Sequence, residues 1–246
     1  MKKKKLLKII LTFAFWIAVW QITAVLVSYE ILLPSPVSTV RSLLSLMKTS
    51  GFYISVLSSV LRIFCGFFCG TLLGIAFGTV SYKSPVAGTL LSPLSKIIKA
   101  TPVASIIVLL FVWFSNSTVT SVTSLLIVLP VVWSSTLTAL NSVDGKLLEM
   151  AEVFRVPVYK RIRDIYFPSV LPSLKAAFSS SMGLAWKSGV AAEVICTPKH
   201  SIGGGIYNAK VYLETPELFA WTLTVILISF ISEKLLLFIL SSKKGT

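Results

Sequence analysis

Residues 54–80 read ISVLSSVLRIFCGFFCGTLLGIAFGTV, a long and predominantly apolar run that decides the fold class. A helix needs roughly 20 apolar residues to cross the hydrocarbon core of a bilayer, so this run is long enough to span a membrane. Every fourth residue in its second half is a glycine: Gly66, Gly70, Gly74 and Gly78. This spacing makes a smooth ridge on one helix face, which indicates close packing against another helix rather than contact with a solute.

Other apolar runs of similar length lie on both sides of this one. The chain is 55% hydrophobic and only 13% charged, whereas soluble domains carry about 25% charged residues. We therefore predict an all-α integral membrane protein with six spans, at 6–27, 54–80, 90–114, 119–140, 172–195 and 218–240. The third is the least regular because Pro93 and Pro102 interrupt it. The first has no small-x-small cleavage site, which favours an uncleaved span over a signal peptide.

The basic residues predict the orientation, because cytoplasmic loops are enriched in Lys and Arg. With the N-terminus inside, 15 of the 23 basic residues fall in cytoplasmic segments, Lys96 and Lys99 among them, and 4 fall outside. Both termini and segment 141–168 are therefore predicted in the cytoplasm, with 30–53 and 196–217 outside. This divides the chain into an N-terminal span and outside loop (1–53), a membrane core (54–240) and a cytoplasmic tail (241–246).

The two outside segments differ in pattern. The stretch VSTVRSLLSLM, at 37–47, is amphipathic and predicts a short outside helix. In the second segment Gly203, Gly204 and Gly205 predict a flexible turn.

The cytoplasmic segment carries the most information. Residues 145–172 read GKLLEMAEVFRVPVYKRIRDIYFPSVLP. A helix is predicted over 146–154, a break at Pro157, and a second, basic helix over 158–167. The first helix carries an apolar stripe of Leu147, Met150, Ala151 and Phe154. This stripe fits either the headgroups of the membrane surface or a groove on a soluble partner.

This segment resembles the "EAA" loop of binding-protein-dependent ABC importer permeases. The matching residues are Glu149, Ala151, Phe154, Ile165, Pro168 and Pro172. Four further stretches resemble the nitrate, sulfonate and taurine branch of these permeases: SSVLRIFCGFFCGTLLGIAFG, LSPLSKIIKATPVASI, GLAWKSGVAAEVI and ETPELFAWTLTVILIS. The chain departs from the pattern at Met150, where the family has alanine, and at Arg155, where it has glycine. Either Arg155 adopts the left-handed conformation of that glycine, or Pro157 redirects the chain.

The resemblance implies a type I importer fold in the bacterial inner membrane and a subunit that works in a larger complex. The implied partners are two ABC ATPase subunits, an extracytoplasmic solute-binding protein, a second identical or closely related permease copy, and membrane lipid. ATP and Mg would be bound by the ATPase, with no cofactor in this chain. Contact with the ATPase is implied for the loop residues Leu147, Glu149, Met150, Ala151, Phe154, Arg155 and Pro168.

Several other chemistries are disfavoured by the residues themselves. The chain has no G-x-x-x-x-G-K-[ST] phosphate-binding loop. His200 is the only histidine, and Cys65 and Cys69 lie on one apolar helical face, so we predict no metal site and no catalytic residues. The net charge of +14 lies at the edges of apolar runs without interleaved aromatics, which argues against nucleic-acid binding.

Charges within spans are candidates for the transport pathway. Lys187 lies deep in the fifth span on a face of small residues, and Glu193 and Arg62 lie in the fifth and second spans. Lys187 faces either an aqueous pathway or an acid such as Glu233 or Glu193 of a second copy. Lys175 and Lys234 lie where their side chains can snorkel to the membrane surface.

These observations predict a permease subunit for a small anion, with energy supplied by a separate ATPase. A vitamin or thiamine-precursor cargo is the alternative within the family. An ATP-independent secondary transporter would be expected to show inverted repeats, which are not visible here. An integral membrane enzyme would need a cluster of acids or histidines, and the chain has nine acids and one histidine.

Overall fold

The computed structural model describes residues 2–241, and the predicted tail at 242–246 lies outside them. The first third of the chain forms α1 (Lys2–Val27), the short amphipathic α2 (Pro36–Leu46) and the long α3 (Ser50–Lys83). The middle forms α4 (Pro85–Ala100), α5 (Val103–Trp113) and α6 (Asn116–Asn141). The last part forms α7 (Gly145–Val153), α8 (Val158–Arg161), a π-helical turn η1 (Ile162–Tyr166), α9 (Phe167–Cys196), α10 (Ile202–Val211) and α11 (Thr215–Ser241). No strand occurs among the described residues, so the all-α prediction is confirmed.

The predicted count of six spans is not confirmed. Within residues 2–241, four helices are long and apolar enough to cross a membrane: α1, α3, α6 and α11. The third predicted span, at 90–114, is not one straight helix, because α4 and α5 meet at an angle of 106°. Pro102 stands at this break and precedes the first residue of α5, and a proline cannot continue the hydrogen-bond ladder of the helix before it. Counting this bent pair as one span gives five; the predicted span at 172–195 forms the continuous helix α9 (Phe167–Cys196) but is not among these apolar helices.

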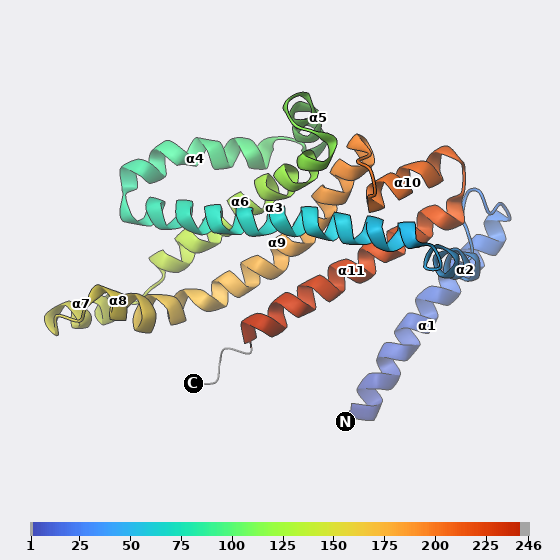
Figure 1. The fold of residues 1–246 in the computed structure, drawn as a ribbon. Helices are drawn as coiled ribbons and strands as arrows, with labels where there is room; N and C mark the ends of the chain where they lie inside the picture. Colours follow the sequence, from blue (N-terminus) through green and yellow to red (C-terminus); the bar gives the residue numbers. More distant parts are fainter. Residues whose placement is uncertain (1, 242–246) are drawn as a thin grey trace.

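The centre of the molecule is formed by α3, α6 and α9, which lie side by side (Figure 1). The α3–α6 contact follows the glycine ridge. A Cβ on Gly70 would lie 2.7 Å from the Leu125 carbonyl oxygen, and one on Gly78 would lie 2.6 Å from the Thr136 Cβ. A Cβ on Gly66 would collide with the Ser121 carbonyl oxygen. The backbones therefore approach as closely as they do only because these positions lack side chains.

The main apolar core fills the space between these helices, α10 and α11. Its buried members are Phe52, Ile63, Phe67, Val128, Val132, Met182, Ala185, Trp186, Val190, Ile202 and Trp221. A smaller cluster joins α5 to α6 and α9 through Ile106, Ile107, Leu110, Val119, Ala192 and Cys196. Most other large apolar side chains are exposed, as expected for a surface that faces lipid.

Helix α1 stands apart from the rest of the bundle (Figure 1). Only 6% of its apolar window, Ile10–Val27, is buried. Trp20 holds the C-terminal part of α1, because its ring stacks near Phe219 of α11 and its Nε1 donates to the Pro34 carbonyl at 3.0 Å.

The segments predicted on opposite sides of the membrane lie at opposite ends of the bundle. Helices α2 and α10 lie at one end, and α7 and α8 lie at the other (Figure 1). The expectation of a flexible glycine turn in the second outside segment is wrong, because Gly203, Gly204 and Gly205 form the first turn of α10. That turn is closely packed: a Cβ on Gly203 would collide with Glu193, and one on Gly205 would meet the Trp221 ring.

Two of the basic residues counted as cytoplasmic, Lys96 and Lys99, lie on a helix of the bundle. Helix α4 runs back alongside α3 (Figure 1). Lys96 and Lys99 lie roughly 16 and 21 Å along it from Pro85, at 1.5 Å per residue. They therefore do not lie in a cytoplasmic loop, but without them the predicted cytoplasmic segments still hold 13 basic residues against 4.

Candidate functional site

The loop between α6 and α9 is built around α7. The Asp144 carboxylate caps the start of α7 by accepting from the Lys146 amide at 2.9 Å. At its end the Arg155 amide donates to the Glu152 carbonyl at 2.9 Å, and the Val156 amide donates to the Ala151 carbonyl at 2.8 Å. These two bonds form a Schellman motif, which places its C′ residue in the left-handed conformation.

Arg155 is that C′ residue, with φ of 51°. Arg155 therefore adopts the left-handed conformation expected of the family glycine, which was the first of the two possibilities for this turn. A non-glycine residue there costs roughly 1–2 kcal/mol. The next turn stabilises it, since the Arg161 Nε donates to the Val156 carbonyl at 2.8 Å.

The apolar stripe of α7 is divided between the interior and the surface. Leu147, Met150 and Phe154 are 42%, 48% and 74% exposed, whereas Ala151 is completely buried. Ala151 is therefore not available to a partner. Glu149 lies exposed on α7 and Pro168 lies exposed in the first turn of α9.

After Pro157 the chain is helical without interruption to the end of α9. The π-helical turn η1 brings Tyr166 beside Tyr82, near the C-terminal end of α3, with 3.4 Å between the hydroxyl oxygens. This bond raises the pKa of Tyr166 above its ordinary value. It also connects the loop directly to a long membrane helix, a contact that no local sequence pattern indicates.

Arg62 and Glu193 meet at the opposite end of the bundle. Their Nη1 and Oε1 atoms lie 3.4 Å apart, and the Glu193 side chain is fully buried. The Ser59 hydroxyl donates to Glu193 Oε2 at 2.7 Å, and the Gly203 amide donates to the same oxygen at 3.1 Å. Ser59 in turn accepts from the Ile202 amide at 2.9 Å. The carboxylate is thus paired and hydrogen-bonded, which a buried charge requires.

The same network holds the connection from α9 to α10. Arg62 donates to the Lys199 and His200 carbonyl oxygens, each at 3.1 Å. Thr197 and His200 in this connection have positive φ, at 43° and 51°, a conformation that persists only where the surroundings hold it. Sequence reasoning missed Ser59, although it lies one turn before Arg62 and Ile63 on α3. Arg62 and Glu193 were predicted as pathway residues, and that role stays a prediction.

Lys187 lies on an exposed face of α9 with Ala176, Ser180 and Gly183. A Cβ on Gly183 would meet no other atom within 4 Å, so this face is open. Neither acid considered as a partner reaches Lys187 within the chain: Glu193 pairs with Arg62, and Glu233 accepts a hydrogen bond from Ser179. Among the described residues Lys187 forms no ion pair.

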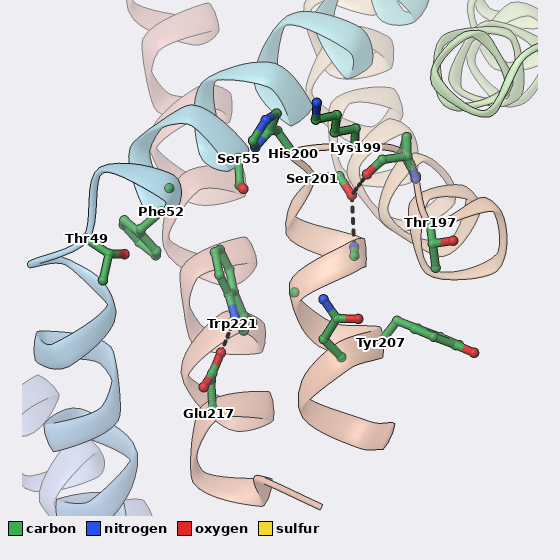
Figure 2. A pocket seen from close by; sticks show the side chains of 15 residues that line it. Thr49, Phe52, Ser55, Thr197, Lys199, His200, Ser201, Tyr207, Glu217 and Trp221 are labelled. Atoms are coloured by element: carbon green, nitrogen blue, oxygen red, sulfur yellow. Dashed lines mark hydrogen bonds between the residues drawn. The ribbon is translucent and has the colours of Figure 1, made fainter. Parts of the chain in front are cut away.

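A cavity of about 540 Å³ lies between the start of α3, the α9–α10 connection, α10 and α11. Figure 2 shows Lys199 and His200 on one side of it and Glu217 and Trp221 on the other. The Trp221 Nε1 donates to the Glu217 carboxylate at 3.1 Å. The residues described hold no group of three or more His, Cys, Asp or Glu that could bind a metal.

Residues 70–241 match the family described as "Binding-protein-dependent transport system inner membrane component". A protein of Bacillus subtilis named as an aliphatic sulfonates transport permease, SsuC, is 28% identical over 208 residues, which cover 83% of this chain and 74% of that protein.

Two further relatives extend this similarity. The taurine transport system permease protein TauC of Escherichia coli is 25% identical over 231 residues, 90% of this chain and 83% of that protein. The nitrate import permease protein NrtB of Synechococcus elongatus is 22% identical over 207 residues, 79% of this chain and 73% of that protein. The family match spans well over half of the chain and includes α6, the α7 loop and α9, so the chain belongs to the family of inner-membrane components of binding-protein-dependent transport systems.

Proposed function

We propose that this chain is the permease subunit of an ATP-driven importer and forms the pathway for a small organic or inorganic anion, such as a sulfonate, taurine or nitrate. The relatives named for sulfonate, taurine and nitrate transport support an anionic cargo. Within this chain the proposal depends chiefly on Lys187, an exposed cation on an open face of α9 that forms no ion pair among residues 2–241.

The position of Lys187 makes a purely structural role costly. It lies roughly 13 Å along α9 from the end of that helix. An unpaired cation at the centre of a bilayer costs roughly 2.5–3.5 kcal/mol even on a lenient scale. Water in a shared pathway would remove this cost, and the small side chains around Lys187 leave room for a solute.

Energy for transport would come from separate ATPase subunits, since this chain has no phosphate-binding loop. Their proposed docking surface is the exposed apolar face of Leu147, Met150 and Phe154 at one end of the bundle. The solute-binding protein would dock at the opposite end, which holds α2 and α10 (Figure 1). Two copies of this chain would enclose the pathway, with both termini in the cytoplasm.

The test is transport by the reconstituted complex. The chain is purified with its ATPase and binding protein, placed in lipid vesicles, and assayed for ATP-dependent uptake of labelled taurine, ethanesulfonate, nitrate and thiamine. We expect uptake of one or more anions and not of thiamine. We expect Lys187→Met to lower anion uptake about tenfold, because a hydrogen bond to a charged group is lost, without loss of assembly.

Lys234→Met is the matched control, since Lys234 is also an exposed lysine on a membrane-spanning helix, α11. It should transport normally. Normal anion uptake by a stable Lys187→Met complex would rule out the substrate role of Lys187. Uptake of thiamine without uptake of any of the anions would show that the cargo is a vitamin and not an anion.

A further inference from the structure

Helix α4 exposes two different faces along the bundle. Val86, Leu90, Leu94 and Ile97 form an exposed apolar face. Thr89, Ser92, Lys96 and Lys99 form a second face, the polar face of α4, with Ser92 half-buried and the others exposed. Both sets recur at intervals of three and four residues, so each lies on one side of the helix. A helix in lipid alone would need no such polar face.

Among residues 2–241 neither lysine takes part in an ion pair. Helix α4 packs on α3 and α6, and none of the three helices contains an Asp or Glu. Among the described residues, the only ion pairs are Arg62–Glu193 and Arg163–Asp164. The described part of one copy therefore leaves Lys96 and Lys99 to be neutralised by an anion or solvated by water.

The backbone of α4 also contains a carbonyl group that needs a hydrogen-bond donor from outside the helix. Pro93 lies inside the helix and has no amide hydrogen, so the Thr89 carbonyl loses its usual helical donor. The helix then ends at the 106° break that leads into α5. At membrane depth, interrupted helices are tolerated where they are buried in protein or line a water-filled cavity.

The depth of the break follows from α5. Its outward side chains are large and apolar, with Val108, Leu109 and Val112 more than half exposed. Such a surface is stabilised by hydrocarbon, which favours a position of the break and the adjacent Lys99 at the level of the bilayer over one in a soluble loop.

We propose that the polar face of α4 lines the solute pathway and that Lys96 and Lys99 bind the anionic group of the solute as it passes. This inference rests on the proposed function for its anionic cargo. It adds a second cationic site to Lys187 of α9, on a different helix.

The first test measures water access and does not depend on transport. In a chain with Cys65, Cys69 and Cys196 replaced by alanine, single cysteines are introduced at the polar face (Ser92→Cys, Lys96→Cys, Lys99→Cys) and the apolar face (Leu90→Cys, Leu94→Cys, Ile97→Cys). The assembled complex in vesicles is treated with an anionic, membrane-impermeant methanethiosulfonate. We expect the polar-face thiols to react at least about tenfold faster, because a thiol ionises in water and the thiolate then attacks the reagent, forming a mixed disulfide and releasing methanesulfinate.

Equal reactivity on the two faces would overturn the proposal. So would reaction at Lys99→Cys with no reaction at Ser92→Cys, because the lysines would then only reach the membrane surface by snorkelling. The difference in reactivity between the two faces of α4 can be measured even in a complex that transports none of the tested anions. A failure of the proposed anion transport is therefore distinguishable from a failure of the proposed pathway along α4.

The second test measures recognition. Lys96→Gln combined with Lys99→Gln should lower ATP-dependent uptake of the transported probe, nitrate or ethanesulfonate, by about tenfold or more. Lys83→Gln, at the exposed end of α3, is the control and should leave uptake unchanged. Unchanged uptake in the double variant would refute anion binding by these lysines. Loss of assembly that is restored by neutralising an acid would also refute it, since the lysines would then be structural.

Discussion

At the scale of single residues, the contact between α3 and α6 depends on the absence of side chains. A Cβ on Gly74 would lie 2.8 Å from the Val132 Cβ and 2.9 Å from the Leu129 carbonyl oxygen. The second of these is backbone, which cannot rotate away as a flexible side chain can. One methyl group would therefore push two central helices apart.

We expect Gly74→Ala to destabilise the protein by about 1–3 kcal/mol, the usual cost of overpacking. The control is Gly51→Ala, in the first turn of the same helix, where a Cβ meets nothing within 4 Å. Thermal unfolding of both variants in detergent measures the difference. Equal melting temperatures would show that the ridge is not tightly packed in solution.

The buried carboxylate of Glu193 depends on its partners in the same way, at the level of single residues. One of its oxygens is bound by Ser59 and Gly203, and the other pairs with Arg62. Removing one partner of a buried ion pair typically costs about 3–5 kcal/mol, because the remaining charge stays buried. Replacing Arg62 would therefore disturb the fold of the α9–α10 connection as well as any pathway.

At the scale of elements, α7 is a short helix of which both ends are held. Asp144 caps its start, and the Schellman motif at Arg155 closes its end. The strain at Arg155 is tolerated because two backbone bonds and the Arg161 side chain fix the turn. The motif keeps the exposed apolar face of α7 at the end of the bundle, in a fixed position relative to α9.

The exposed face of α7 gives a prediction about coupling. We expect Phe154→Ala to weaken binding of the ATPase roughly tenfold or more, as loss of a buried aromatic anchor does in other interfaces. Binding is measured with purified subunits in detergent. The control is Tyr212→Ala, because Tyr212 is also aromatic and, like Phe154, 74% exposed, but lies at the end of α10. Equal affinity of the two variants would place the ATPase elsewhere.

At the scale of the whole molecule, the two ends of the bundle are predicted to face different compartments. The asymmetry of 13 basic residues against 4 predicts that the α7 end faces the cytoplasm. Helices α2 and α10 would then face outward (Figure 1).

Labelling of intact cells tests this orientation. In the cysteine-free chain, an impermeant thiol reagent should modify Tyr212→Cys and spare Lys146→Cys. Tyr212 is exposed at the end of α10 and Lys146 is exposed on α7, and these two helices lie at opposite ends of the bundle (Figure 1). Permeabilising the cells should make the second position reactive, which controls for local access. The reverse pattern in intact cells would invert the topology and the proposed sites of both partners.

The sequence by itself determined the properties that depend on neighbours along the chain. Runs of apolar residues predicted α1, α3, α6 and α11 to within a few residues, because hydropathy over a window is a local quantity. The i, i+4 spacing predicted the glycine ridge of α3, and Pro157 predicted the end of the α7 helix.

Only the tertiary structure decided which groups meet. Arg62 and Glu193 are 131 residues apart in the chain, and local patterns cannot report which distant groups share a buried site. The same holds for the burial of Ala151, for the packed helical turn at Gly203–Gly205, and for the packing of α4, the helix of Lys96 and Lys99, along α3. Each depends on the surface of another helix, and burial is a property of the assembled fold rather than of any one segment.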